Sequence, residues 1–130
     1  MLELRYRWLW LGSIWLLVLL IIVASLLPTA FAVTQGGVDK LGHFLSYLLL
    51  ALVGAGTVGA ERIATVMARV IVLGLALEAA QALLTATRSA EWADVAANTA
   101  GVLVAWWLCH RGFAGWARQA EAWLERRRQP

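Results

Sequence analysis

The feature that most constrains this chain is a long run without a single charged residue, from Trp8 to Leu27. A helix rises ~1.5 Å per residue, so this run is long enough to cross the ~30 Å hydrocarbon layer of a bilayer. Pro28 follows it and would end the helix. The whole chain is 62% hydrophobic and only 15% charged, whereas soluble domains are about 45–50% apolar. The run therefore predicts a membrane-spanning helix.

Three more apolar blocks follow, and together with the first they predict helices at about 8–27, 41–60, 63–84 and 92–109. Strands are excluded because open sheet edges cannot be satisfied in lipid and four segments cannot close a barrel. Gly54, Gly56 and Gly59 match a dinucleotide-binding pattern, but they lie in an apolar helix with no preceding strand, which favours close helix packing. We predict an all-α membrane protein: a bundle of four transmembrane helices forming a single domain over residues 1–130.

The basic residues predict how the helices are oriented. With the N-terminus inside, the inner side receives Arg5, Arg7, Arg62, Arg111, Arg118 and Arg126–Arg128, and the outer side receives only Lys40 and Arg88. The positive-inside rule then places both termini in the cytoplasm. A competing reading is a signal peptide with a cleavage site at Ala30-Phe31-Ala32, although the apolar run exceeds the usual ~7–15 residues.

The tail, residues 112–128, predicts an amphipathic helix. Phe113, Trp116, Ala120 and Trp123 recur on one helical face, and Glu121 is expected to lie away from it. We expect this helix to lie on the inner leaflet, with the C-terminal arginines near lipid headgroups. The alternative is a cytoplasmic helix packed on the bundle or on a partner. The net charge of +3 therefore indicates membrane topology, and no nucleic-acid partner is predicted.

Polar residues form a stripe on each of the last three predicted helices. Asp39, His43 and Tyr47 share one face, as do Glu78, Gln81 and Arg88, and then Asp94 and Asn98. Antiparallel connectivity brings the stripes to the same level in the outer leaflet. We predict an outward-facing polar pocket in which Glu78 and His43 are the candidate catalytic residues, because a deep carboxylate needs a partner or a proton. The candidate ligand-binding residues are Asp39, Lys40, Tyr47, Gln81, Arg88, Asp94 and Asn98.

Each of these residues also has a structural interpretation. Asp39 and Asp94 could cap their helices, and Lys40 and Arg88 could pair with Asp39, Glu91 or Asp94. Gln81 and Asn98 could join helices, and Tyr47 could be a core aromatic residue. His43, Glu78, Asp94 and Asp39 could supply metal ligands, but no spacing typical of metal sites supports this. We predict no metal and no cofactor.

These motifs resemble the VanZ-like family. Asp39-Lys40-Leu41-Gly42-His43-Phe44 with Tyr47 is similar to its D-K-x-x-H-F-x-x-Y signature, Glu78 and Gln81 to its E-x-x-Q element, and Arg88, Asp94, Asn98 and Gly101 to its closing element. Glu91 departs from the family, which tends to have a small hydroxyl residue there. The resemblance implies a multi-pass protein of the bacterial inner membrane, linked to low-level resistance to the glycopeptide teicoplanin.

The predicted pocket suits an amphiphilic envelope molecule, such as a lipid-linked cell-wall precursor or a lipophilic glycopeptide, which it would bind or modify. Whether a reaction is catalysed stays open. One alternative is a small transporter or proton-relay subunit, which would need to form a homo-oligomer. Another is a structural membrane scaffold without a ligand, in which the polar stripes only hold the helices together.

Overall fold

A computed structural model describes residues 2–27, 37–84 and 91–128. All the secondary-structure elements in these residues are helices or helical turns. The elements are α1 (Arg7–Leu26), α2 (Gly37–Gly56), the short 3₁₀ turn η2 (Ala60–Arg62), α3 (Ile63–Leu84), α4 (Trp92–Leu108), the wide π-type turn η3 (Cys109–Phe113) and α5 (Trp116–Arg128). The cleavage site at residues 30–32 considered above lies outside the described residues.

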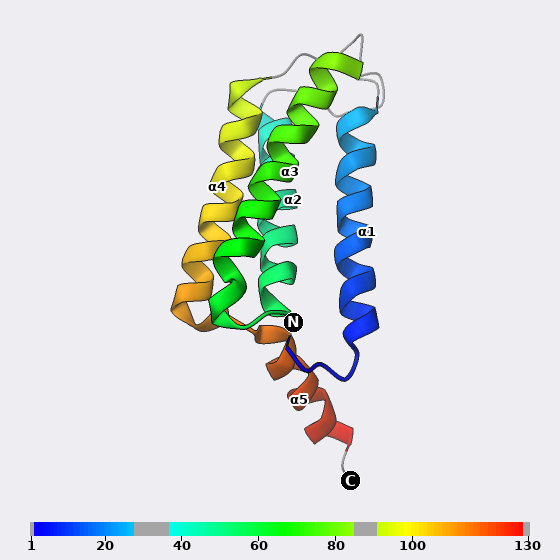
Figure 1. The fold of residues 1–130 in the computed structure, drawn as a ribbon, viewed down its shortest axis with the longest axis vertical. Helices are drawn as coiled ribbons and strands as arrows, with labels where there is room; N and C mark the ends of the chain where they lie inside the picture. Colours follow the sequence, from blue (N-terminus) through cyan, green and yellow to red (C-terminus); the bar gives the residue numbers. More distant parts are fainter. Residues whose placement is uncertain (1, 28–36, 85–90, 129–130) are drawn as a thin grey trace.

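Helices α1 to α4 run alternately up and down beside one another, and both chain ends lie at the same end of the molecule (Figure 1). Three described segments are long and apolar enough to cross a membrane: Arg7–Leu26, Val38–Gly56 and Ala60–Leu84. The all-helical prediction is therefore confirmed. Helix α4 has 17 residues, which is at the short limit for crossing, so its membrane crossing stays a prediction.

The predicted boundaries of the second helix were wrong by about one turn. It was expected at 41–60, whereas α2 spans Gly37–Gly56. The N-terminal shift places Asp39 and Lys40 inside the helix, where Asp39 lies near Lys40 and His43 of the same helix and Lys40 reaches Asp94 of α4. The chain leaves the helix after Gly56, where Thr57 donates its hydroxyl to the Gly54 carbonyl at 2.8 Å. The predicted range began at Leu41 because it followed the apolar block, although Asp39 had been placed on the same helical face as His43.

The core lies where α4 packs on α2, which is the most extensive contact between helices. Gly101 makes this contact close: a Cβ there would collide with the Phe44 carbonyl and would lie 2.9 Å from the Leu48 backbone nitrogen. Ala51 and Ala105 are fully buried in the same core. Small residues at such a contact let two backbones approach closely. This approach brings the polar first turns of α2 and α4 together.

Helix α5 packs on the bundle through a carboxylate. Glu121 accepts hydrogen bonds from the backbone N–H groups of Arg5 (2.9 Å) and Tyr6 (3.0 Å) and from Trp10 Nε1 (2.8 Å). Only 6% of Glu121 is exposed, so the expectation that it would lie away from the packed face was wrong. The two backbone donors lie just before α1, where N–H groups lack partners within the helix and need other acceptors. Whether α5 also lies on a membrane surface stays a prediction.

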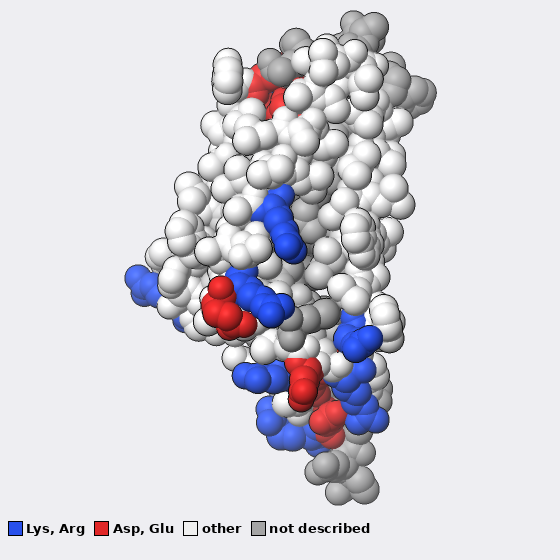
Figure 2. All heavy atoms as spheres, viewed as in Figure 1, with Lys and Arg blue, Asp and Glu red and all other residues white. Residues whose placement is uncertain are grey.

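Most charged side chains lie toward the ends of the molecule. Figure 2 shows basic and acidic atoms around the end that carries both termini and α5, some basic atoms at middle height, and a separate acidic group at the far end. Between the ends, large apolar side chains point outward; Trp15, for example, is 68% exposed. An exposed apolar belt between charged ends is typical of a protein surrounded by lipid.

Candidate functional site

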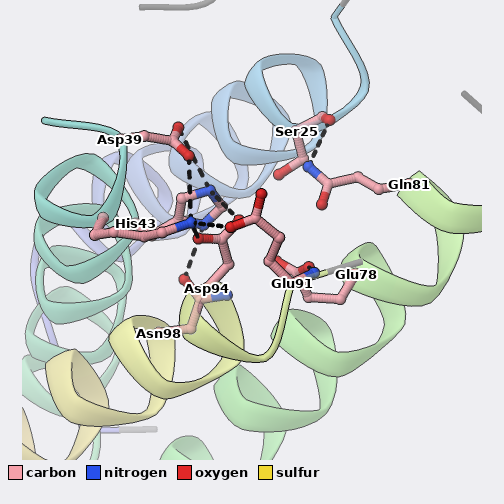
Figure 3. A network of polar contacts seen from close by, with 9 residues as sticks. Ser25, Asp39, His43, Glu78, Gln81, Glu91, Asp94 and Asn98 are labelled. Carbon is pink, nitrogen blue, oxygen red and sulfur yellow. Dashed lines mark hydrogen bonds and ion pairs between the residues drawn. The ribbon is translucent and has the colours of Figure 1, made fainter. Parts of the chain in front are cut away.

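The described residues of the predicted stripes meet at the end of the bundle away from the termini (Figure 3). The first two turns of α2 supply Asp39, Lys40 and His43, the last turns of α3 supply Glu78, and the first two turns of α4 supply Asp94 and Asn98, with Glu91 just before them. We call these seven residues the polar cluster. Three helices predicted separately thus bring their polar residues together, as antiparallel connectivity requires.

Lys40 is the centre of the ion pairs. Its ammonium lies 2.6 Å from Glu91 Oε2 and in closer contact with Asp94, and Asp39 Oδ2 is 3.8 Å away. The Asp94 side chain is 7% exposed, whereas that of Lys40 is 33% exposed. Lys40 therefore joins the start of α4 to the start of α2 and still reaches the surface of the bundle. The proposed pairing of Lys40 with these carboxylates agrees with the structure.

His43 lies between the amide and two of the carboxylates. Its Nδ1 is 3.1 Å from Asn98 Oδ1, and its Nε2 is 3.6 Å from Asp94 Oδ2 and 3.9 Å from Asp39 Oδ1. If Nδ1–H donates to Asn98, Nε2 of the neutral ring is an acceptor, and in the imidazolium form its N–H would face the two carboxylates. An imidazole in this position can take up a proton and pass it on, which is a common role of histidine.

Asp39 and Asp94 lie in the first turns of α2 and α4. Helix α2 begins at Gly37, so Asp39 is inside the helix rather than its cap. The residue before α4 is Glu91, whose side chain makes no capping hydrogen bond. Both aspartates are therefore side-chain partners of the cluster, and carboxylates in a first turn are also favoured by the helix dipole.

Glu78 and Gln81 are buried, with exposed fractions of 4% and 2%, but they face different neighbours. Glu78 Oε2 accepts a hydrogen bond of 3.4 Å from the backbone N–H of Glu91. Gln81 donates from Nε2 to the Ser25 carbonyl at 2.8 Å and so ties α3 to the end of α1. This contact fits the joining role considered above, since the Gln81 amide is directed at α1 in Figure 3, and the ligand-binding role of Gln81 stays a prediction.

Tyr47 lies one turn deeper than His43 and is 2% exposed. Its ring packs against Gly74 of α3, where an added Cβ would lie 3.0 Å from the ring. This places Tyr47 at the floor of the polar cluster, within the hydrophobic core. Of the remaining predicted site residues, Arg88 lies outside the described residues.

Glu91 was considered from the sequence as a partner for Lys40, and its side chain does bond Lys40; its backbone hydrogen bond to Glu78 was not foreseen. The Ser25 main-chain carbonyl, which accepts from Gln81 beside the cluster, was missed entirely. A backbone acceptor carries no residue-type signal, so nothing in the sequence could have identified it.

Three cluster residues have metal-ligand geometry. Asp39, His43 and Asp94 each present one donor atom, and these atoms lie within 4.8 Å of one another. Glu78, the fourth residue considered from the sequence, is not in this group. The Lys40 ammonium already lies against Asp39 and Asp94, so a cation would have to displace it from these carboxylates. The three donor atoms are therefore close enough to bind a metal ion, but the Lys40 ammonium competes for two of the carboxylates.

The polar cluster has more acidic than basic groups. Asp39, Glu78, Glu91 and Asp94 supply carboxyl groups, while Lys40 is the cation among the described cluster residues. Such a site can accept hydrogen bonds from hydroxyl and amino groups, and Lys40 can meet an anionic oxygen. Within the described residues, no fully buried side-chain nitrogen or oxygen lacks a hydrogen-bond partner, so binding would exchange existing partners rather than fill vacant ones.

Comparison with known proteins adds no relative: no family model, no curated protein and no solved structure matches this chain. The functional conclusion must therefore come from the polar cluster itself.

Proposed function

We propose that this chain is a VanZ-like integral membrane protein of the bacterial cell envelope, and that its polar cluster binds the headgroup of an amphiphilic envelope molecule. The observation that supports this most is the contact between residues of separate helices: His43 with Asn98 at 3.1 Å, and Lys40 with Glu91 at 2.6 Å. Lys40, His43 and Asn98 belong to the D-K-x-x-H and D-x-x-x-N motifs that carry the resemblance, whereas Glu91 departs from the family pattern.

The proposed orientation places this cluster at the extracytoplasmic surface of the inner membrane, with both termini in the cytoplasm and α4 as a fourth membrane helix. The concentration of basic residues at the end with the termini supports it (Figure 2). A headgroup at the outer surface would then meet carboxylates at membrane depth, while its acyl or prenyl chain stays in lipid.

A lipid-linked cell-wall precursor has the matching chemistry. Its sugar hydroxyls and peptide amino groups are donors for Asp39, Asp94 and Glu91, and its phosphates are partners for Lys40, whose side chain is 33% exposed. A lipophilic glycopeptide carries similar sugar and amino groups on an acyl tail. We propose binding first; if chemistry follows, Glu78 and His43 are the acid–base candidates.

The test uses a bacterial strain in which the protein confers a measurable change in glycopeptide susceptibility. His43→Ala, Asp94→Asn and Glu78→Gln are each expected to remove most of that change at unchanged protein level. Glu61→Gln is the control, because Glu61 is an exposed carboxylate at the opposite end of α3. Full phenotype in all three cluster variants would refute the proposal.

A proton relay is the second candidate, and the position of His43 between Asn98 and two carboxylates favours it. It predicts proton flux in proteoliposomes that His43→Ala and Glu78→Gln abolish. A purely structural cluster gives a third result: the same variants would lower thermal stability, and function would fall only in proportion to the folded fraction.

A further inference from the structure

A groove lies near the other end of the bundle, between α1 and α3, with α2 as its floor. Its cavity volume is about 690 Å³, which is in the range of pockets that hold small organic ligands. The groove includes none of the residues of the polar cluster. Its lining comes from α1, the end of α2, the turn after α2, and the first half of α3.

The walls of the groove are mostly apolar. Leu11 and Val18 line it from α1, Leu50 lies at the floor, and Leu73 lines it from α3. All three helices that form it belong to the segments long enough to cross a membrane. A lateral apolar groove at this depth would be in contact with lipid chains rather than with water.

Two arginines interrupt this apolar lining. Arg62, the last residue of η2, and Arg69, in the second turn of α3, both line the groove and are seven residues apart, about two helical turns. Side chains on a helix lean toward its N-terminus, so the Arg69 guanidinium is directed back toward Arg62. Figure 2 shows basic atoms on this face up to the middle height of the helices.

Acidic groups among the described residues do little to balance the positive charge of these two arginines. Arg69 forms no ion pair with any residue in the described ranges 2–27, 37–84 and 91–128. Arg62 approaches Glu61 at 3.8 Å, but both side chains are more than 60% exposed, at 63% and 72%. An exposed pair of this kind is weak. A cation within a membrane-spanning segment is costly unless it meets an anion or the interface.

We propose that this groove binds an anionic phospholipid of the bilayer. The headgroup phosphate lies between Arg62 and Arg69, and one acyl chain occupies the apolar groove between α1 and α3. Arginine suits this role because its planar guanidinium donates two parallel hydrogen bonds to a phosphate. Thr65, which lines the groove between the two arginines, adds a hydroxyl donor. The inference is independent of the function proposed for the polar cluster.

Charge complementarity selects this occupant over the alternatives. A helix from a second copy would fill the apolar groove, but it would leave both guanidinium groups without an anion. A zwitterionic lipid would fill the groove equally well, but its own cation would lie beside the arginines. Only an anionic headgroup on an acyl chain matches both the charge and the apolar walls.

The test is native mass spectrometry of the full chain released from a neutral detergent, after incubation with phosphatidylglycerol or with phosphatidylcholine of identical acyl chains. The expected result is one retained phosphatidylglycerol and weaker retention of phosphatidylcholine. The Arg62→Gln, Arg69→Gln double variant is expected to lose roughly thirtyfold in phosphatidylglycerol affinity. Arg118→Gln, which removes an exposed arginine of α5, is expected to bind as the wild type does.

Thr65→Trp tests the groove without changing charge. Thr65 is exposed at the rim, so a larger side chain fills the groove without disturbing the core, and lipid retention should fall at unchanged thermal stability. Soluble glycerol phosphate should not compete. Equal retention of the two lipids, an equal effect of Arg118→Gln, full competition by glycerol phosphate, or a dimer in place of bound lipid would each overturn the proposal.

Discussion

At the scale of single residues, buried carboxylates hold this protein together at both ends. Asp94 and Glu121 are 5% and 6% exposed, and each has donors from a segment distant in sequence. Asp94 meets Lys40 of α2, and Glu121 meets the backbone at the start of α1. A buried carboxylate is stable only when hydrogen-bond donors surround it. Removing the carboxylate therefore also leaves those donors without an acceptor.

Replacing Asp94 by Ala should destabilise the protein by about 1–3 kcal/mol, because the ammonium of Lys40 loses its closest partner while staying partly buried. Asp39→Ala is the matched control: its side chain is 24% exposed and its contacts with Lys40 and His43 are 3.8 and 3.9 Å. Its effect should be below about 1 kcal/mol. Thermal unfolding in detergent measures both, and equal effects would contradict the central role of Asp94.

Because Glu121 joins α5 to the start of α1, we predict that this contact weakens in acid. Burial raises the pKa of its carboxyl, but the hydrogen bonds from Trp10 and from the backbone of Tyr6 and Arg5 outweigh this and hold the pKa below 4.5, its ordinary value. A carboxyl with a lowered folded-state pKa stabilises the fold above its ordinary pKa, and this stabilisation is lost as the pH falls through the folded-state pKa. The attachment should therefore be complete above pH 4.5 and weaken below it.

The fluorescence of Trp10 and Trp116, whose rings lie 5.2 Å apart, can follow this transition as the pH is lowered. Glu121→Gln should remove the acid dependence and weaken the attachment at neutral pH. Glu125→Gln is the control, since Glu125 pairs with Arg5 only at the exposed surface and should leave the transition in place. A transition that persists in Glu121→Gln would assign it to another group.

At the scale of elements, the contact between α2 and α4 sets the geometry of the polar cluster. Gly101 lets the α4 backbone reach Phe44 and Leu48 of α2; His43 directly precedes Phe44, and Asn98 lies about one turn before Gly101, so the two side chains meet. At the end with the termini, Gly112 and Gly115 adopt positive φ angles of 110° and 63°, which favour glycine. They turn the chain from α4 into α5.

Gly101→Ala should destabilise the protein by about 1–3 kcal/mol, because the added methyl group forces the two helix backbones apart. Gly42→Ala on α2 is the control: its Cβ would meet nothing within 4 Å, and it should raise stability by about 0.4–1 kcal/mol through helix preference. Thermal unfolding gives both values. A neutral Gly101→Ala would show that the close approach of α4 is not required.

At the scale of the whole molecule, the charge distribution predicts how the bundle is oriented in a membrane. Both termini and the turn between α2 and α3 lie at the end rich in basic residues (Figure 1). The cluster lies at the other end. If basic residues stay in the cytoplasm, then residues 3 and 61 are inside and residue 92 is outside.

Cysteine labelling in intact cells tests this orientation. The only cysteine is Cys109, which is buried, so Cys109→Ala gives a suitable background. Trp92→Cys, at a position that is 86% exposed, should react with a membrane-impermeant reagent. Glu3→Cys and Glu61→Cys should react only after the membrane is opened. Labelling of position 61 in intact cells would reverse the assigned sides.

The sequence by itself determined the helical class and the approximate ends of α1, α3 and α4, because block length and helical spacing are local properties. It also placed His43, Asp94 and Asn98 at the same depth. Only the tertiary structure decided which groups meet: Lys40 with Glu91, Gln81 with the Ser25 carbonyl, and Glu121 with the amides at the start of α1. The physical reason is that a backbone partner has no residue type, and a partner on another helix is chosen by how closely the helices pack. The shift in α2 has a related origin, because Lys40 in its first turn finds its closest partner, Asp94, on α4.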